Sequence, residues 1–292
     1  MSETTPRPQR PFLIRAGGQL LSLERPMVMG IINVTPDSFY DGGRYETREM
    51  VRLRAERMLT DGAAILDIGA CSTRPGSPGI DAESEKMRLE PALSAIRESY
   101  PEAVISVDTY RASVAAWAVE EFGVQMINDV SGGRLDTEMF STIGRLKVPY
   151  VLMHMLGTPG TMQMNPTYHD VAGDLSVFFY EKISELRACG VDDILIDPGF
   201  GFGKTIEHNY ELIARLGELR MFDLPLVVGV SRKSMIYRVL DSSPESALNG
   251  TTVIHTVALL NGANILRVHD VKQAVECIDL VEKIKEGYGF SL

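Results

Sequence analysis

One stretch of sequence shows the pattern that decides the fold: ILDIGACSTRPGSPGIDAESEKMRLEPALSAIRES, residues 65–99. It opens with a short apolar run at Ile65, which is typical of a buried strand. A loop rich in glycine and proline follows over residues 71–79. An amphipathic pattern with helical spacing then covers Asp81–Ser99. The stretch therefore predicts a unit of strand, loop and helix.

The same unit recurs from Met27 to the end of the chain, about every 34 residues. Alternation of strands and helices predicts a parallel sheet with helices on its outer face. Eight such units in one chain of this length predict an α/β fold, the closed (β/α)8 barrel of the TIM type. The strands are expected to begin near Met27, Ile65, Val104, Gln125, Pro149, Ile194, Leu226 and Ile265, and helical patterns cover Glu49–Leu59, Asp81–Ser99, Asp174–Cys189 and Ala247–Leu260.

An open doubly wound sheet is the alternative architecture, because it shares the alternation of strands and helices. Its glycine-rich turn after the first strand, with an acidic residue about 20 positions later, is missing here. At the N-terminus, residues 1–11 are polar and contain several prolines, which predicts a flexible tail. Phe12–Leu23, with Gly17-Gly18 at its middle, predicts a short hairpin. We therefore expect one barrel domain over residues 12–292.

The composition excludes several classes of protein. The 292 residues are 45% hydrophobic and 23% charged, with a net charge of −10. That balance is typical of a folded domain, and a chain this acidic without a basic stripe does not favour nucleic acid or anionic membranes as partners. Cys71, Cys189 and Cys277 are odd in number and far apart, which argues against a disulfide framework. Without an apolar leader or membrane span, the expected location is the cytoplasm.

Polar residues gather at the ends of the predicted strands. In a (β/α)8 barrel the catalytic groups lie at the carboxyl ends of the strands, where the following loops converge. A single polar residue there could be a helix N-cap, but seven of the eight strands end in this way. The residues are Asn33, Asp67, Asp108, Asn128, Asp129, Asp197, Ser231, Arg232, Lys233, Arg267, His269 and Asp270.

Two kinds of ligand chemistry follow from these residues. Side chains two apart on a strand share a face, so Arg267 and His269 are expected to point the same way, as are Ser231 and Lys233. Arginine and histidine together suit a phosphate group, and barrels often bind phosphate after strands seven and eight. The alternative is that Arg267 simply pairs with a neighbouring carboxylate.

The remaining groups suit a heterocycle. Asp108, Asn128 and Asp197 supply acceptors and an amide, and Lys233 supplies a donor. A ring edge with adjacent N–H and amino donors beside a carbonyl, as in guanine or pterin, matches this set because a carboxylate accepts two parallel N–H bonds. A metal site from the same acids is possible, but no histidine-rich or tight aspartate cluster supports it.

Five motifs resemble those of the bacterial dihydropteroate synthases, a family of pterin-binding barrels, and they follow one another in the family's order from about residue 27 to 275. They are Met29–Phe39, Ser72–Gly76, Asp197–Lys204, Gly229–Ser234 and Arg267–Asp270.

The resemblance implies a reaction in which 6-hydroxymethyl-7,8-dihydropterin diphosphate meets 4-aminobenzoate and gives 7,8-dihydropteroate and diphosphate. It also implies a homodimer, Mg²⁺ near Asn33, and a target of sulfonamides. Position by position, it places the pterin against Asp108, Asn128, Asp197 and Lys233, with Met153 and Gly229 lining its slot. It assigns the diphosphate to Asn33, Arg74, Arg267 and His269. It assigns the 4-aminobenzoate to Thr73, Pro75, Phe202, Ser231 and Lys233, under loops that carry Phe39 and Asp41. Asp108, Asp197, Lys233 and Arg267 are the residues we expect to carry the chemistry.

Three rival functions share part of this pattern. A pterin-binding methyltransferase would need no diphosphate-binding site, whereas Arg267 and His269 indicate that such a site is present. An aldolase would use Lys233 in a Schiff base, but the adjacent Ser231 and Arg232 suit contact with an anion better. A barrel without activity, kept for binding, would not need the whole set of polar strand ends.

Overall fold

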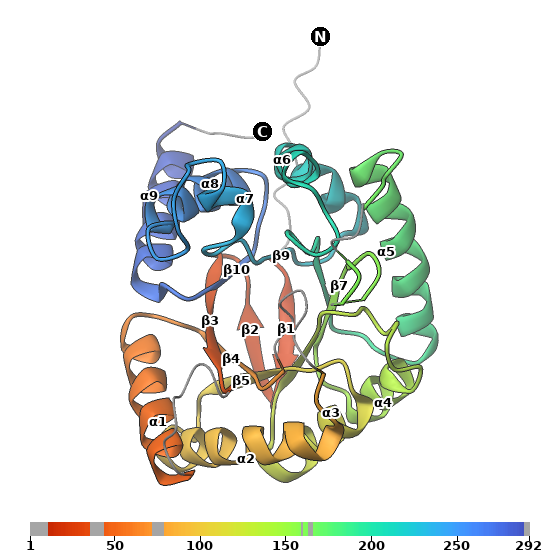
Figure 1. Cartoon of the computed structure of the whole chain (residues 1–292), viewed down its shortest axis with the longest axis vertical. Helices are drawn as coiled ribbons and strands as arrows, with labels where there is room; N and C mark the ends of the chain where they lie inside the picture. Colours follow the sequence, from red (N-terminus) through yellow and green to blue (C-terminus); the bar gives the residue numbers. More distant parts are fainter. Residues whose placement is uncertain (1–10, 36–43, 72–78, 159, 163–165, 289–292) are drawn as a thin grey trace.

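The protein folds as a closed barrel of eight parallel strands surrounded by helices (Figure 1). The structure, a computed structural model, describes residues 11–35, 44–71, 79–158, 160–162 and 166–288. The hydrogen-bonded strands follow the order β8-β7-β6-β5-β4-β3-β10-β9. An isolated parallel bridge between Ile196 and Leu226 joins the two ends of this series, so the sheet closes on itself.

Each barrel strand begins at, or one residue from, the position that the sequence predicts. The strands are β3 (Met27–Asn33), β4 (Ile65–Gly69), β5 (Val104–Asp108), β6 (Met126–Asp129), β7 (Tyr150–Met153), β8 (Ile194–Asp197), β9 (Val227–Val228) and β10 (Ile265–Val268). The helices are α1 (Arg44–Thr60), α2 (Ala82–Ser99), α3 (Ala112–Phe122), α4 (Met139–Leu146), α5 (Val171–Ala188), α6 (Ile206–Ala214), α7 (Ser234–Tyr237), α8 (Leu248–Leu260) and α9 (Val271–Tyr288), with a 3₁₀ helix, η2, at Leu216–Phe222. The prediction of a (β/α)8 barrel is confirmed, and the open doubly wound sheet is excluded.

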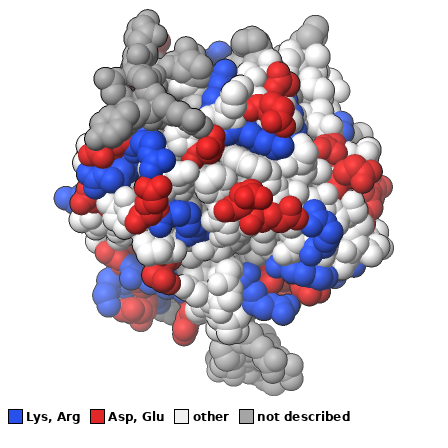
Figure 2. Space-filling model, turned by 90° about the horizontal axis from the view of Figure 1, so that it is seen from below, with Lys and Arg blue, Asp and Glu red and all other residues white. Residues whose placement is uncertain are grey.

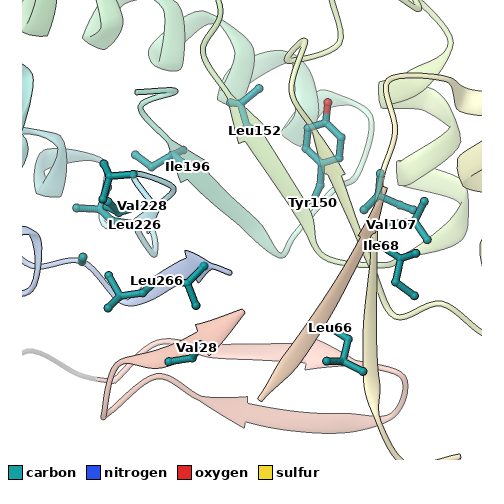
Figure 3. Packing of buried hydrophobic residues seen from close by; sticks show 14 of the residues in the cluster. Val28, Leu66, Ile68, Val107, Tyr150, Leu152, Ile196, Leu226, Val228 and Leu266 are labelled. Carbon is teal, nitrogen blue, oxygen red and sulfur yellow. The ribbon is translucent and has the colours of Figure 1, made fainter. Parts of the chain in front are cut away.

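The outward side of every strand packs against the helices. Apolar side chains such as Leu66, Tyr150 and Leu266 are fully buried there and belong to one large cluster that surrounds the barrel (Figure 3). Parallel strands covered by helices lose their contact with water on that side, which explains why their sequences are apolar runs rather than strict alternations. The outer cluster therefore fixes the barrel without using the inward side chains.

The predicted hairpin is present and closes the N-terminal end of the barrel. Strands β1 (Leu13–Ala16) and β2 (Gln19–Ser22) pair antiparallel across Gly17-Gly18, and both glycines have positive φ. At Gly17 a side chain would also collide with Gln125, since a Cβ would lie 2.5 Å from Cγ of that residue. The hairpin contributes Ile14 to the apolar cluster inside the barrel.

The inward side chains form an apolar floor beside the hairpin. We use "apolar floor" for one inward residue from each strand: Met29, Ile65, Val104, Met126, Val151, Leu195, Val227 and Ile265. Since alternate residues of a strand share a face, the next inward residue of each strand lies one step closer to the carboxyl ends. That step is where the interior becomes polar.

No helix among the described residues is long and apolar enough to cross a membrane. On the face drawn in Figure 2, acidic and basic side chains are interspersed, without a broad patch of one sign. The predicted tail lies outside the described residues, apart from Pro11.

Candidate active site

A polar layer lies directly above the apolar floor. The inward residues two positions after the floor residues are Ile31, Asp67, Ser106, Asn128, Met153, Asp197, Gly229 and Arg267. Five of these eight side chains carry polar groups, although the strands that supply them are otherwise apolar. A buried charge is costly unless it is paired and hydrogen-bonded, so this layer is built for binding or catalysis rather than for packing.

Arg267 is the centre of this layer. Its Nε donates to Oδ2 of Asp67 over 2.7 Å, and its second guanidinium nitrogen donates to Oδ2 of Asp108 over 2.7 Å. Burial acts against the charge of Arg267, but the two carboxylates outweigh it and raise the pKa of this guanidinium. Burial raises the pKa of Asp108 to about 7, and Arg267 opposes that rise. The sequence left open whether Arg267 meets an anion or a carboxylate, and in the structure it donates to two carboxylates.

Asn128 extends the network and leaves acceptors without partners. Its Nδ2 donates to Asp67 over 3.1 Å, which orients the amide so that Oδ1 is free. Among the described residues, Oδ1 of Asn128, Oδ1 of Asp67 and the Ser106 hydroxyl are buried with no hydrogen-bond partner. Unpaired buried polar atoms are rare because each costs about 1–3 kcal/mol. These atoms are therefore available to bond a molecule that enters the layer.

Asp197 and Lys233 face each other across a glycine. A Cβ built on Gly229 would lie 3.8 Å from Oδ2 of Asp197, 3.9 Å from Nζ of Lys233 and 3.9 Å from Cβ of Arg267. The absence of a side chain at Gly229 thus leaves a small space bordered by the Asp197 carboxylate, the Lys233 amine and the first side-chain carbon of Arg267. Burial raises the pKa of Asp197, with Lys233 opposing, and burial lowers the pKa of Lys233 to about 8, with Asp197 opposing.

Lys233 is held by the loop that follows β8. Its Nζ donates to the carbonyl of Phe200 over 2.5 Å and lies 4.6 Å from the centre of the Phe202 ring. The expectation that Ser231 and Lys233 share a strand face is wrong, because β9 already ends at Val228 and the chain turns at Arg232, where φ is +54°. Lys233 reaches the site from this turn rather than from a strand.

His269 and Ser231 form a pair at the rim of the barrel. The backbone N–H of His269 donates to Oγ of Ser231 over 3.2 Å, and Oγ lies 3.1 Å from Nδ1 of the same histidine. This arrangement favours donation from the serine hydroxyl to Nδ1, which leaves the ring proton on Nε2. Burial, with the charge of Arg267, lowers the pKa of His269 to about 4, so the ring is a neutral donor at pH 7. The guanidinium of Arg232 forms two bonds with Asp270, and the expected contact of Arg232 with an anion stays a prediction.

Asn33 stands at the carboxyl end of β3. It pairs in register with Gly69, which pairs with Asp108, so the three residues lie side by side at the carboxyl-terminal end of the barrel. A Cβ on Gly69 would lie 3.7 Å from Oδ1 of Asn33 and 3.3 Å from Cβ of Asp108. No group of three His, Cys, Asp or Glu residues suited to a metal exists in the part of the chain that the structure describes. The amide oxygen of Asn33 could bind Mg²⁺ only together with phosphate oxygens of a substrate, because one protein oxygen is too few to hold the ion.

The other predicted site residues divide into two groups. Met153 belongs to the polar layer, and Phe202 lies beside Lys233, so both border the site. Several residues lie outside the described part of the chain, and their predicted roles stay predictions. They are Phe39, Asp41, Thr73, Arg74 and Pro75.

Two residues of the layer had no role in the sequence interpretation. Asp67 was noted only as a polar strand end, yet it joins Arg267 to Asn128 and is completely buried. Ser106 lies inside the strand predicted to begin near Val104, and it pairs in register with Asp67. The signal was a charged or hydroxyl residue inside an otherwise apolar strand, two positions after an inward apolar residue.

Comparisons with known proteins agree with this site. The family described as "Pterin binding enzyme" matches residues 29–269, which include the whole polar layer. The dihydropteroate synthase of Escherichia coli (strain K12) is 42% identical over 269 residues, covering 91% of this chain and 94% of the relative. That of Synechocystis sp. is 39% identical and covers 89% of this chain and 91% of the relative.

Solved structures share the fold over nearly the full length. The Yersinia pestis dihydropteroate synthase in complex with a sulfonamide drug is 40% identical, with a TM-score of 0.88 over 94% of this chain and 100% of that one. The Xanthomonas albilineans enzyme with 4-aminobenzoic acid is 38% identical, with a TM-score of 0.86 over 94% of this chain and 98% of that one. The chain therefore belongs to the family of pterin-binding enzymes, among the dihydropteroate synthases.

Proposed function

We infer that this chain condenses 6-hydroxymethyl-7,8-dihydropterin diphosphate with 4-aminobenzoate, giving 7,8-dihydropteroate and diphosphate. The observation that carries this inference is the polar layer, which combines buried polar atoms without hydrogen-bond partners with an acid and an amine that border the position of Gly229. Family membership names the reaction, and the layer supplies the groups that the reaction needs.

The pterin fits the space beside Gly229. The Asp197 carboxylate, whose Oδ1 already accepts the N–H of Gly199 over 2.7 Å, presents Oδ2 to the amino and N–H donors of the ring. The unpartnered Oδ1 of Asn128 offers a further acceptor, and Lys233 offers a donor to the ring carbonyl. Met153 supplies an apolar wall. Burial between these groups would satisfy the atoms that the free protein leaves unpaired.

The diphosphate fits the rim, beside Arg267, His269 and Asn33. The neutral His269 would donate from Nε2, and Arg267 would turn part of its fork from the carboxylates to the anion. Asn33 would hold Mg²⁺ through its amide oxygen together with diphosphate oxygens, and the ion would neutralise charge on the leaving group. Arg74 is proposed to join these residues from outside the described part of the chain.

The chemistry requires the bond between the pterin methylene carbon and the diphosphate oxygen to break. The electron pair leaves with the diphosphate, whose charge the rim donors stabilise. The carboxylates of Asp108 and Asp197 would oppose the positive charge on the methylene and the ring. The neutral amino group of 4-aminobenzoate then forms the new C–N bond and releases a proton, so no general base is required to activate it.

The second substrate is proposed to lie between Phe202, Ser231 and Lys233. The Phe202 ring offers a flat apolar surface next to the lysine amine. The Xanthomonas albilineans relative is described with 4-aminobenzoic acid and the Yersinia pestis relative with a sulfonamide drug. We therefore propose that 4-aminobenzoate and sulfonamides compete for this place. Thr73, Pro75, Phe39 and Asp41 are proposed to complete it.

We further propose a homodimer. Large apolar side chains are exposed on the helices that cover one side of the barrel, among them Val253 on α8 and Leu280 on α9, which are 55% and 67% exposed. Such side chains on helices remote from the site would be covered by a second copy.

The proposed reaction predicts that diphosphate release depends on the second substrate. Purified protein given the pterin diphosphate and Mg²⁺ should release diphosphate rapidly only when 4-aminobenzoate is added, and one 7,8-dihydropteroate should form for each diphosphate. A phosphate-coupled assay with chromatography of the pterin product measures both quantities. Equal release with and without 4-aminobenzoate would instead indicate a hydrolase.

Substitution of Gly229 by alanine should separate binding from folding. The added methyl meets its neighbours at 3.8–3.9 Å, an ordinary contact distance, so the free energy of unfolding should change little. The same methyl occupies the proposed pterin space, and overpacking of this kind costs about 1–3 kcal/mol. Calorimetric titration with the pterin, beside urea unfolding of the same variant, measures the two effects. Unchanged affinity would place the pterin elsewhere.

A further inference from the structure

Lys204 is a buried cation outside the set of residues assigned to the substrates. It lies just before α6, is 3% exposed, and burial lowers its pKa well below the ordinary value. Its Nζ contacts Nδ1 of His154 at 3.0 Å, the carbonyl of Gly199 at 3.0 Å and the carbonyl of Phe202 at 3.2 Å. Among the described residues, no carboxylate forms an ion pair with it. A buried ammonium without a carboxylate is costly, so the contacts it makes require an explanation.

These contacts tie down the loop between β8 and α6. Gly199 and Gly203 have positive φ, and the loop lies so close to the segment after β7 that a Cβ on Gly199 would lie 1.9 Å from the carbonyl oxygen of His154. Lys204 crosses this narrow junction, since it bonds His154 on one side and two carbonyls of its own loop on the other. Removal of the amine would take one donor from each of these carbonyls and cut their link to His154, although the Gly199 carbonyl would keep the N–H of Phe202 at 3.1 Å.

The same loop holds two groups of the site. The N–H of Gly199 donates to Asp197, and the carbonyl of Phe200 accepts from Lys233. The ring of Phe202 lies beside the Lys233 amine. The carbonyls that bond Lys204 belong to Gly199 and Phe202, so Lys204 fixes the residues that orient Asp197 and Lys233.

We propose that Lys204 is a positioning residue for the reaction: by tying Gly199 and Phe202 to His154, it holds the Lys233 amine beside the Gly229 space that Asp197 also borders, in the geometry that receives the pterin. This proposal rests on the function inferred above. A lysine with only a general stabilising role would act equally whether or not Lys233 were present.

The test compares three variants with wild type: Lys204→Met, Lys233→Met and the double variant. Methionine keeps an apolar stem of similar length and removes the amine. Because a displacement of about 1 Å at a reacting group can cost about 100-fold, we expect Lys204→Met to lower kcat/KM for the pterin diphosphate about 100-fold. In the Lys233→Met background the same change should lower kcat/KM far less, whereas independent effects would multiply to within about twofold.

A second readout is the pH dependence of pterin binding. Burial holds the pKa of Lys233 near 8. If Lys204 keeps the loop closed over this amine, Lys204→Met should let water reach it and move the alkaline limb of binding to higher pH. A change that only lowered global stability would reduce the amount of folded protein and leave the limb in place.

Lys147→Met is the matched control, because Lys147 also donates to a carbonyl, that of Gly190 at 2.7 Å, but on the surface and remote from the polar layer. It should keep wild-type kcat/KM. Urea unfolding of all variants, with activity expressed per folded protein, corrects for stability. The proposal is overturned if the Lys204→Met and Lys233→Met effects multiply, or if Lys204→Met behaves as Lys147→Met. A wild-type protein without turnover would instead overturn the proposed function.

Discussion

Replacement of Asp197 by asparagine is expected to weaken pterin diphosphate binding by about 2–5 kcal/mol, the loss typical of a buried charged hydrogen-bond pair that is broken from one side. The asparagine oxygen can keep the bond to the N–H of Gly199, which fixes the orientation of the side chain. The amide NH₂ then takes the place of Oδ2 and faces the donors of the ring and of Lys233. The NH₂ group would then face hydrogen-bond donors both on the pterin ring and on Lys233, and it could accept from neither. Isothermal titration measures the loss.

The control is Asp192→Asn, which makes the same chemical change on an exposed residue before β8 that forms a 3.5 Å ion pair with Arg15. Its binding of the pterin should equal that of wild type. If Asp197→Asn also binds as wild type does, Asp197 does not receive the ring, and the proposed orientation of the pterin is wrong.

Replacement of Arg267 by alanine should have the largest effect on stability. The guanidinium bonds Asp67, which is fully buried, and Asp108, whose side chain is 12% exposed. Its removal leaves two carboxylates without their cation, and breaking such a buried pair costs about 3–5 kcal/mol. Urea unfolding followed by circular dichroism measures the difference in the free energy of unfolding.

The loss should also depend on pH, in a defined direction. The pKa of Asp108 is about 7 in the folded protein, and Arg267 holds it down. Without Arg267 it rises further, so the folded variant keeps a proton that the unfolded chain has released. Folding then requires proton uptake, which becomes harder as pH rises. The difference in the free energy of unfolding between the variant and wild type should therefore increase as the pH rises above about 7.

Arg215→Ala is the control for this prediction. Arg215 also bonds several carboxylates, those of Asp170, Glu211 and Glu218, but at the surface. Exposed pairs contribute about 0–1 kcal/mol, so this variant should lose little stability. A loss for Arg267→Ala as small as that for Arg215→Ala, or a gap that narrows with rising pH, would contradict the role of Arg267 as the cation of the layer.

The fold could be predicted because each unit carries its own signals. Asp81 shows this at the start of α2, where its side chain accepts the N–H of Ser84 over 2.8 Å and caps the helix that the sequence pattern predicts. The strands are apolar runs because helices cover them. The presence of eight such strands predicts that the sheet closes into a barrel. The short β9 differs from expectation because pattern alone does not show where pairing stops: the backbone turns at Arg232, a position that no composition rule marks.

The site could be predicted as a set of residues but not as a set of contacts. Asp67 and Arg267 are 200 positions apart in the chain, and their bond depends on the pairing of β10 and β4 with opposite edges of β3. The sequence pattern places Arg267 on the inner face, but it cannot show whether a carboxylate or an anion receives it. It also does not reveal the role of Lys204, because a lysine after a glycine-rich loop looks like a surface residue until the loop has folded over it.

The closure of the barrel has a consequence for its motions. β8 and β9 meet through the bridge between Ile196 and Leu226, whereas each of the other neighbouring strands that the structure describes pairs over two or more residues. Asp197 ends β8 on one side of this seam, and Gly229 and Lys233 follow β9 on the other. Segments with few backbone hydrogen bonds open at a lower free energy than the rest of a domain. A pterin bound both by Asp197 and by the residues that follow β9 would therefore link the two strands across the least-bonded junction of the sheet. We expect local opening between β8 and β9 to decrease when the substrate is bound.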